Sequence, residues 1–285
     1  MRVTFSLLAA AAVVNAAGVL PGQIKNLVTF GDSYTDVVNV GDGGTAWPVY
    51  AAGYAKLSLF PFARSGATCS NNITFRPFPP LFESQLPTYF AEVENKTLKL
   101  DSRKTIYTLW IGTNDVGSNA LLTGSDKATV VDTTRCAVNW VKVLYESGAR
   151  NFLFQNMIPL QLVPMYSAAA YPNRFWNAPF NATEWSVFMT ELTTAGNAIA
   201  ELLLQNLART LPGAHIGLFD SHSLFQDMFN RPSAYLNGTA PLNVTGAVNA
   251  CVFPEQGQPG DPFCTVAQGT DRDSFLWYVP GYFVA

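Results

Sequence analysis

The chain has 285 residues, a formal net charge of -3 and a pI of about 5.4, a length that suits one large α/β domain or two small ones. Charged residues make up 13% of it, against roughly 25% in an average soluble protein. No basic stripe is present, which argues against nucleic-acid binding.

The N-terminus has the pattern of a secretory signal peptide. A positive start at Met1-Arg2, an apolar run to Val14 and small residues up to Ala17 occur in that order. A buried N-terminal helix is the alternative. We expect cleavage to remove residues 1–17 and to leave 18–285 as a single secreted domain. No later segment has 18 consecutive apolar residues, so no membrane association is expected after cleavage.

Strand and helix patterns alternate along the rest of the chain. Continuous apolar runs predict strands at 27–30, 58–62 (the weakest), 105–111, 151–157 and 215–219. Helices are expected at 47–55, at 80–93 with an interruption at Pro87, at 129–147, at 183–210 and at 224–229. After Phe229 the chain reads as loop. This alternation predicts a parallel sheet flanked by helices, with the site at the carboxyl ends of the strands.

Residues suited to ester hydrolysis follow three of these strands. The first strand is followed by Gly31-Asp-Ser33, the second by Ala63-Arg-Ser-Gly-Ala-Thr-Cys69 and the third by Gly112-Thr-Asn-Asp115. A serine nucleophile needs donors aimed at the oxyanion of the tetrahedral intermediate. The backbone N–H groups of Ser33 and Gly66 and the side-chain amide of Asn114 are the candidate donors.

The segments FGDSYTD, ARSGATCSN and WIGTND, in this order and spacing, resemble the first three blocks of the GDSL (SGNH) esterases. The similarity is greater to secreted fungal carbohydrate acetyl esterases and extends from about Val28 to Tyr278. The resemblance implies a flavodoxin-like three-layer α/β/α sandwich and no metal or other cofactor. It also implies that Ser33 is the nucleophile and that Ser33, Gly66 and Asn114 form the oxyanion hole.

Other interpretations of these residues remain open from sequence. Ser33 suits a helix N-cap and Asn114 an Asx-turn. Asp32 and Asp115 suit either a carboxylate pair of a glycosidase or hydrogen bonding to loops, which we favour. No Gly-x-Ser-x-Gly elbow is present, which argues against the α/β-hydrolase fold.

The fourth block of the resembling family, Asp-x-x-His, does not occur in this sequence. The sequence remains family-like through Tyr278 and then changes. We expect that a retained intron or frame error has replaced the catalytic segment, and a non-catalytic relative is the alternative. Only two histidines are present. His215 is expected at the wrong edge of the sheet, and His222, two residues after Asp220, is expected too far from Ser33 to replace the missing base.

The four cysteines allow three connectivities, of which we favour Cys251–Cys264, a local pair, with Cys69–Cys136 as the other. N-glycosylation sequons occur at Asn72, Asn95, Asn181, Asn237 and Asn243. Neither Cys-x-x-Cys nor His-Glu-x-x-His is present, so no zinc site is indicated.

Together these features predict a secreted, monomeric, glycosylated serine esterase. Its substrates would be small-molecule or oligosaccharide esters with short acyl groups, acetyl above all, and Trp47 and Trp110 are candidates for stacking on sugar rings. We expect its activity to be impaired, because the catalytic Asp and His are missing. The alternative function is carbohydrate binding without turnover.

Overall fold

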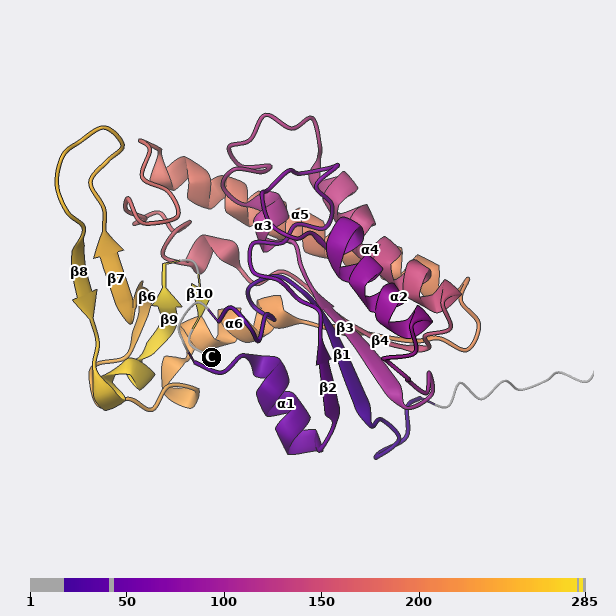
Figure 1. Cartoon of the computed structure of the whole chain (residues 1–285). Coiled ribbons are helices and arrows are strands. Elements are labelled where there is room, and N and C mark those ends of the chain that lie inside the picture. Colours follow the sequence, from indigo (N-terminus) through magenta and orange to yellow (C-terminus); the bar gives the residue numbers. More distant parts are fainter. Residues whose placement is uncertain (1–17, 41–43, 281, 284–285) are drawn as a thin grey trace, which may run out of the picture.

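The computed structural model describes residues 18–40, 44–280 and, for the backbone only, 282–283. The expected signal peptide lies outside these residues. A five-stranded parallel sheet in the order β2-β1-β3-β4-β5 forms the centre (Figure 1). The strands are β1 (Asn26–Gly31), β2 (Ser58–Pro61), β3 (Thr105–Trp110), β4 (Asn151–Gln155) and β5 (His215–Phe219). This order is that of a flavodoxin-like sheet, so the predicted fold class is confirmed.

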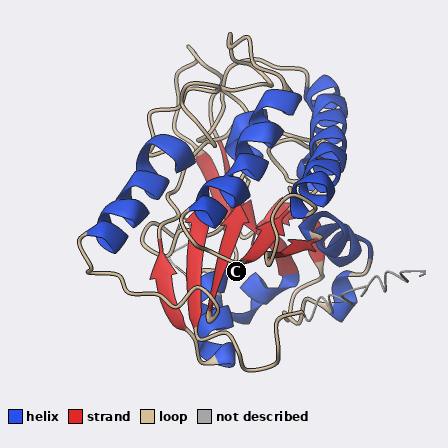
Figure 2. Ribbon diagram, turned by 90° about the vertical axis from the view of Figure 1, so that its right-hand side faces the viewer, coloured by secondary structure: helices blue, strands red, loops and turns tan. Residues whose placement is uncertain are grey.

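Helices cover both faces of the sheet (Figures 1 and 2). One face carries α2 (Leu86–Glu94), α4 (Val130–Glu146) and α5 (Ala182–Ala208), and the other carries α1 (Trp47–Ala55) and α6 (Ser221–Asn230). Between the sheet and α2, α4 and α5 lies an apolar core that includes Phe30, Trp140 and Leu144, none of which is exposed. Burial on this scale is the main source of the fold's stability.

The α4 helix shows how local sequence sets an element's bounds. Thr129 caps it, since the Thr129 Oγ1 accepts the Asp132 N–H at 3.3 Å while the Asp132 carboxylate accepts the Thr129 N–H at 2.9 Å. This reciprocal capping box satisfies N–H groups that a helix start leaves unpaired. The short helices are η1 (Leu81–Gln85), α3 (Thr113–Val116), η2 (Leu160–Leu162), η3 (Pro232–Ala234) and η4 (Gly269–Ser274).

The expected interruption at Pro87 is wrong. The π-helical turn η1 runs directly into α2, and Pro87 lies in the first turn of α2. Proline is tolerated there because the N–H that it lacks would have no partner within the helix.

The prediction of a loop after Phe229 is also wrong. The segment forms two small sheets from β6 (Asn243–Ala247), β7 (Asn249–Val252), β8 (Phe263–Val266), β9 (Phe275–Val279) and β10 (Tyr282–Phe283). The β9 strand pairs with β6, about 30 residues earlier, and buries Trp277 completely. Short strands whose partners are remote give no local periodicity, so their pairing was not visible in the sequence.

The structure contains two disulfides, Cys69–Cys136 and Cys251–Cys264, the connectivity that we favoured. The first ties the loop after β2 to α4, and the second joins directly opposed residues of β7 and β8. Of the five sequon asparagines, Asn243 is half-buried and the other four are exposed. No helix among the described residues is long and apolar enough to cross a bilayer.

Candidate active site

The segments that follow β1, β2 and β3 come together at one edge of the sheet. In the parallel register Gly31, the last residue of β1, lies beside Trp110, the last residue of β3. The segments that carry Ser33 and Asn114 therefore begin side by side. The Gly31 carbonyl accepts the Arg64 N–H at 3.1 Å, and the Asp36 carboxylate accepts the Ser65 N–H at 2.7 Å. These bonds fix the first block against the second.

Ser33 lies in a turn and is half-exposed. The Thr35 and Asp36 N–H groups donate to the Asp32 carbonyl at 3.0 Å, and no helix starts here, so the N-cap interpretation is wrong. The turn needs Gly31, because a Cβ at that position would stand 2.2 Å from the Trp110 carbonyl oxygen. A hydroxyl is therefore presented at the end of a central strand.

The buried side chain of Gln85 holds the backbone of this turn at Gly31. Its side chain accepts the Gly31 N–H at 3.1 Å and donates to the Gly31 carbonyl at 2.8 Å. Gln85 is 2% exposed, so both bonds are shielded from water. Its place in the sequence, 54 residues after Gly31, gave no signal of this contact.

Gly66 has the left-handed φ of +80°. A Cβ there would also lie 2.4 Å from Cγ of Phe78, whose ring therefore packs directly on this backbone. Both the conformation and the close approach require glycine. The backbone at Gly66 is thus partly exposed and is covered on one side by the Phe78 ring.

Asn114 lies in the short helix α3 and connects the second and third blocks. Its Nδ2 donates to the Ala67 carbonyl at 2.9 Å, and its Oδ1 accepts from Arg76 Nη1 at 2.8 Å. Its partners are remote in sequence, so the Asx-turn interpretation is wrong. The amide nitrogen carries a second hydrogen, which the expected oxyanion role would use. Sequence reasoning missed Arg76, for which the only signal is its place just after the second block.

Two buried carboxyl groups lie beneath these loops. Asp115 accepts the Cys69 N–H at 3.0 Å and the Thr74 hydroxyl at 3.0 Å, while Asp32 accepts the Tyr34 N–H at 3.0 Å. Burial raises the pKa of Asp32 to about 7 and that of Asp115 to about 6. Each side chain is 1% exposed and bonded to loop backbone, which is the loop-holding arrangement that we favoured over a glycosidase pair.

Each histidine contacts an asparagine at one end of β4. His215 starts β5, at the opposite edge, where its Nδ1 lies 2.8 Å from Asn151 Oδ1. His222 is in the first turn of α6 and its N–H donates to Asn156 Oδ1 at 2.9 Å. The strand preceding it is three strand spacings from β1, or roughly 14 Å. Asp220, and not His222, caps α6, by accepting the Ser223 N–H at 3.0 Å.

The surroundings of His222 also differ from those of a catalytic dyad. Its Nε2 is buried without a hydrogen-bond partner, and burial lowers the pKa of the ring. The Asp220 carboxylate accepts a hydrogen bond from Asn156 Nδ2 at 2.9 Å, and its charge partly opposes the fall in the pKa of the ring. Trp110 and Asn156, at the ends of β3 and β4, lie between this histidine and the serine strand.

The sequence is similar to those of known esterases. The GDSL-like lipase/acylhydrolase family model matches residues 27–239. The chain is 31% identical to an acetylesterase of Hypocrea jecorina, over 94% of this chain and 87% of that protein. It is 28% identical to "Inactive GDSL esterase/lipase-like protein 25" of Arabidopsis thaliana, over 61% of this chain and 43% of that protein.

Among solved structures, a member of the lipolytic G-D-S-L family from Veillonella parvula matches 76% of this chain and 87% of its own, at 14% identity and a TM-score of 0.43. The family match covers well over half of the chain and includes all three blocks. This protein therefore belongs to the GDSL lipase/acylhydrolase family of ester hydrolases.

Proposed function

We propose that this protein is a secreted esterase that acts on short acyl esters of carbohydrates, acetyl esters above all, with Ser33 as nucleophile. The observation that carries the proposal is a hydrogen bond between the second and third sequence blocks: Asn114 Nδ2 donates to the carbonyl of Ala67, the residue after Gly66. This bond sets the Asn114 amide next to the Gly66 backbone, at the edge of the sheet where Ser33 lies.

In the proposed reaction, the Ser33 Oγ attacks the ester carbonyl, the Ser33 proton passes to solvent water, and the carbonyl oxygen becomes an oxyanion. The Ser33 and Gly66 N–H groups and the Asn114 amide donate to this oxyanion. Arg76 bonds the Asn114 Oδ1 and so fixes which end of the amide faces the ligand. The carbon–oxygen bond to the alcohol breaks, and the alcohol takes a proton from solvent as it leaves. A water molecule then attacks the acyl-enzyme, the acid is released and the Ser33 Oγ regains a proton.

The proposed site lacks an identified general base for the Ser33 proton. His215 contacts Asn151 and His222 contacts Asn156, so these contacts of the described residues give no support to general-base catalysis by an imidazole. Such a base contributes about a hundredfold to ten-thousandfold in rate. We therefore propose that the chain as given hydrolyses esters at least about a hundredfold more slowly than a relative with a complete triad.

The carbohydrate part of the proposal rests on relatives and on exposed aromatic side chains. Two acetylesterases, from Hypocrea jecorina and Thermothelomyces thermophilus, are similar to this chain. Phe78, which packs on Gly66, is 43% exposed, and Phe75 is 62% exposed. These rings are better placed to contact a sugar than Trp110, which is 5% exposed and belongs to the core. Trp47 is half-buried and remains a candidate.

Secretion is supported by the leader pattern, by the two disulfides and by the exposure of four sequon asparagines.

Hydrolysis of p-nitrophenyl acetate tests the proposal. The unmodified chain is compared with Ser33→Ala and with Ser65→Ala, a matched control at the same edge whose hydroxyl donates to the Asn39 carbonyl. A third variant carries Asp-x-x-His directly after Tyr278. We expect Ser33→Ala to abolish the slow activity, Ser65→Ala to retain most of it and the third variant to exceed it by about a hundredfold. Equal, high activity of the unmodified chain and the third variant would contradict the proposal.

The alternative, carbohydrate binding without turnover, is favoured by the position of the histidines. It predicts that acetylated xylo-oligosaccharides bind but release no acetate, and that Ser33→Ala leaves both results unchanged.

A further inference from the structure

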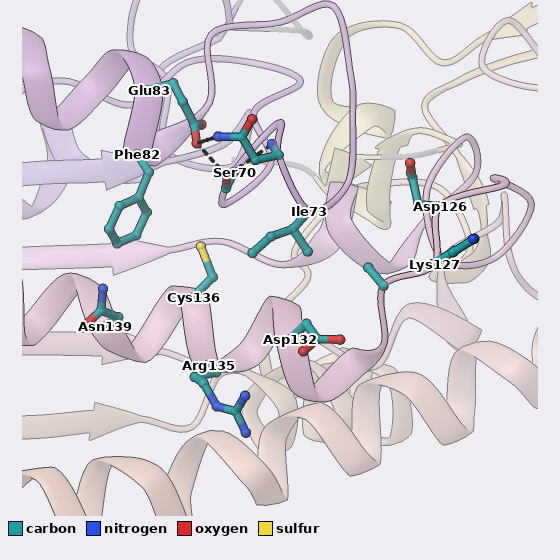
Figure 3. A pocket seen from close by; sticks show the side chains of 12 residues that line it. Ser70, Ile73, Phe82, Glu83, Asp126, Lys127, Asp132, Arg135, Cys136 and Asn139 are labelled. Carbon is teal, nitrogen blue, oxygen red and sulfur yellow. Dashed lines mark hydrogen bonds between the residues drawn. The ribbon is translucent and has the colours of Figure 1, made fainter.

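A groove of about 740 Å³ is lined by residues other than those of the turn that carries Ser33. It runs between the loop that follows Cys69, the turn η1 and the first turns of α4 (Figure 3). Phe82 and Ile73 point into it, and Cys136 of the buried disulfide lies across from them. The volume is in the range of small-ligand sites.

The groove offers both apolar contact and a polar rim of mixed sign. Three carboxylates, those of Glu83, Asp126 and Asp132, and two cations, Lys127 and Arg135, line it. Because neither sign dominates, the rim does not select an anion or a cation. An apolar floor under such a rim suits a neutral ligand with apolar faces and hydroxyl edges, which describes a sugar.

The exposed asparagine of a sequon stands on the wall of this groove. Asn72 lines it, and Thr74 completes the Asn72-Ile-Thr74 sequon. The Asn72 Nδ2, the atom that carries an N-linked glycan, donates to Glu83 Oε1 at 3.0 Å. Glu83 also accepts the Ser70 hydroxyl at 2.5 Å and the Asn71 N–H at 3.2 Å. The bond to Glu83 thus holds the side chain of Asn72 against the groove.

We propose that the groove binds the innermost sugars of a glycan carried by Asn72 itself, packed on Phe82 and Ile73. This inference rests on the secretion proposed above. Glycosylation forms a bond between Nδ2 and the anomeric carbon of the sugar. The bond from that carbon to the pyrophosphate of a lipid-linked oligosaccharide donor breaks, and one Nδ2 proton is released. The hydrogen that remains on Nδ2 is able to keep the bond to Glu83.

Tethering makes weak contacts sufficient. A glycan attached at the wall meets the groove at an effective concentration in the millimolar range or above. The packed sugars would cover Phe82 and Ile73 and also shield the loop that leads from Gly66 to the buried bond between Thr74 and Asp115.

Site-by-site trimming by endoglycosidase H tests the inference, because this enzyme cuts between the two innermost N-acetylglucosamine residues. The chain is produced in a secretory host with high-mannose glycans, and occupancy and trimming of the native protein are followed by peptide mass spectrometry. Asn95, exposed at the end of α2, is the matched internal control. We expect the Asn72 glycan to be trimmed about tenfold more slowly than the Asn95 glycan, which corresponds to roughly 1.4 kcal/mol of packing. Heat denaturation should abolish the difference.

Two groove variants keep the sequon intact. Phe82→Ala, or the milder Ile73→Ala if the first fails to fold, should raise the Asn72 trimming rate to that of Asn95. If Asn72 carries a glycan that is trimmed as fast as the Asn95 glycan, the inference is wrong and the proposed secretion is unaffected. The same holds if Asn72 carries no glycan while other sequons are glycosylated. Absence of glycan at every sequon overturns it together with the proposed secretion. Binding of free chitobiose to Asn72→Gln, lost in Phe82→Ala, would assign the groove to a diffusible sugar instead and also overturn it.

Discussion

Replacement of Asp32 by asparagine is expected to stabilise the protein at neutral and alkaline pH. The side chain is 1% exposed, and its Oδ2 has no hydrogen-bond partner. Burial raises the pKa from 3.8 to about 7; repulsion from Asp115 adds to the rise, while the Tyr34 N–H and the Arg76 charge oppose it. Asparagine keeps an acceptor for the Tyr34 N–H and cannot ionise, so it imitates the protonated acid.

The size and sign of the effect follow from this pKa. A pKa that is about three units higher in the folded state corresponds to about 4 kcal/mol, because one unit is equivalent to about 1.4 kcal/mol. Below pH 3.8 both states hold the proton, and the carboxyl group costs little. Between that pH and about 7 the unfolded state loses its proton first, so the free energy of unfolding falls as pH rises. Above about pH 7 the full penalty is present.

Urea denaturation followed by tryptophan fluorescence at pH 3 to 9 measures the effect. We expect Asp32→Asn to match the unmodified protein within about 1 kcal/mol at pH 3 and to exceed it by up to about 4 kcal/mol at pH 8. Asp261→Asn, at an exposed loop carboxylate, is the matched control and should shift neither value. A difference between the proteins that stays constant from pH 4 to pH 8, or a less stable Asp32→Asn at pH 8, would refute the reasoning.

Three further changes test other contacts. Gly66→Ala should cost about 1–3 kcal/mol in urea denaturation, because alanine meets both the left-handed φ and the Phe78 ring; an unchanged midpoint would contradict this. Arg76→Ala should raise the pH at which the stability gain of Asp32→Asn over its parent levels off, and should enlarge the final gain, since this cation lowers the folded-state pKa of the Asp32 carboxyl, and a fall in that pH would argue against the charge effect. The Cys69→Ser, Cys136→Ser double variant should lose about 4 kcal/mol, because the disulfide closes a loop of 67 residues; a loss below about 1 kcal/mol would show that the unfolded state is already compact there.

Much of the fold could be predicted from local patterns. All five central strands and the starts of α1 and α4 lie within a residue or so of their predicted places. Apolar runs and helix caps are local signals, and the tertiary contacts of this protein favour the same elements that they predict. The flavodoxin-like sheet was implied by the family resemblance, whereas the rule that ligand sites lie at the carboxyl ends of a parallel sheet brought Ser33 and Asn114 to one edge.

The supporting contacts of the site could not be predicted in the same way. Gln85 bonds Gly31 across 54 residues, and Arg76 bonds Asn114 across 38. Neither partner has a spacing that any local period specifies. The small sheets after Phe229 were missed for the same reason, since β6 and β9 are joined only by tertiary pairing.

The sequence by itself determined the family, the candidate nucleophile and the absence of an Asp-x-x-His block, because these depend on residue identity and order. Only the tertiary structure decided what surrounds them. It placed Asp32 out of water beside Ser33, set Arg76 on the Asn114 amide and put β5, the strand that precedes His222, three strand spacings from β1. Distance, burial and the electrostatics that depend on them arise from packing between remote segments, and a linear order of residues does not contain them.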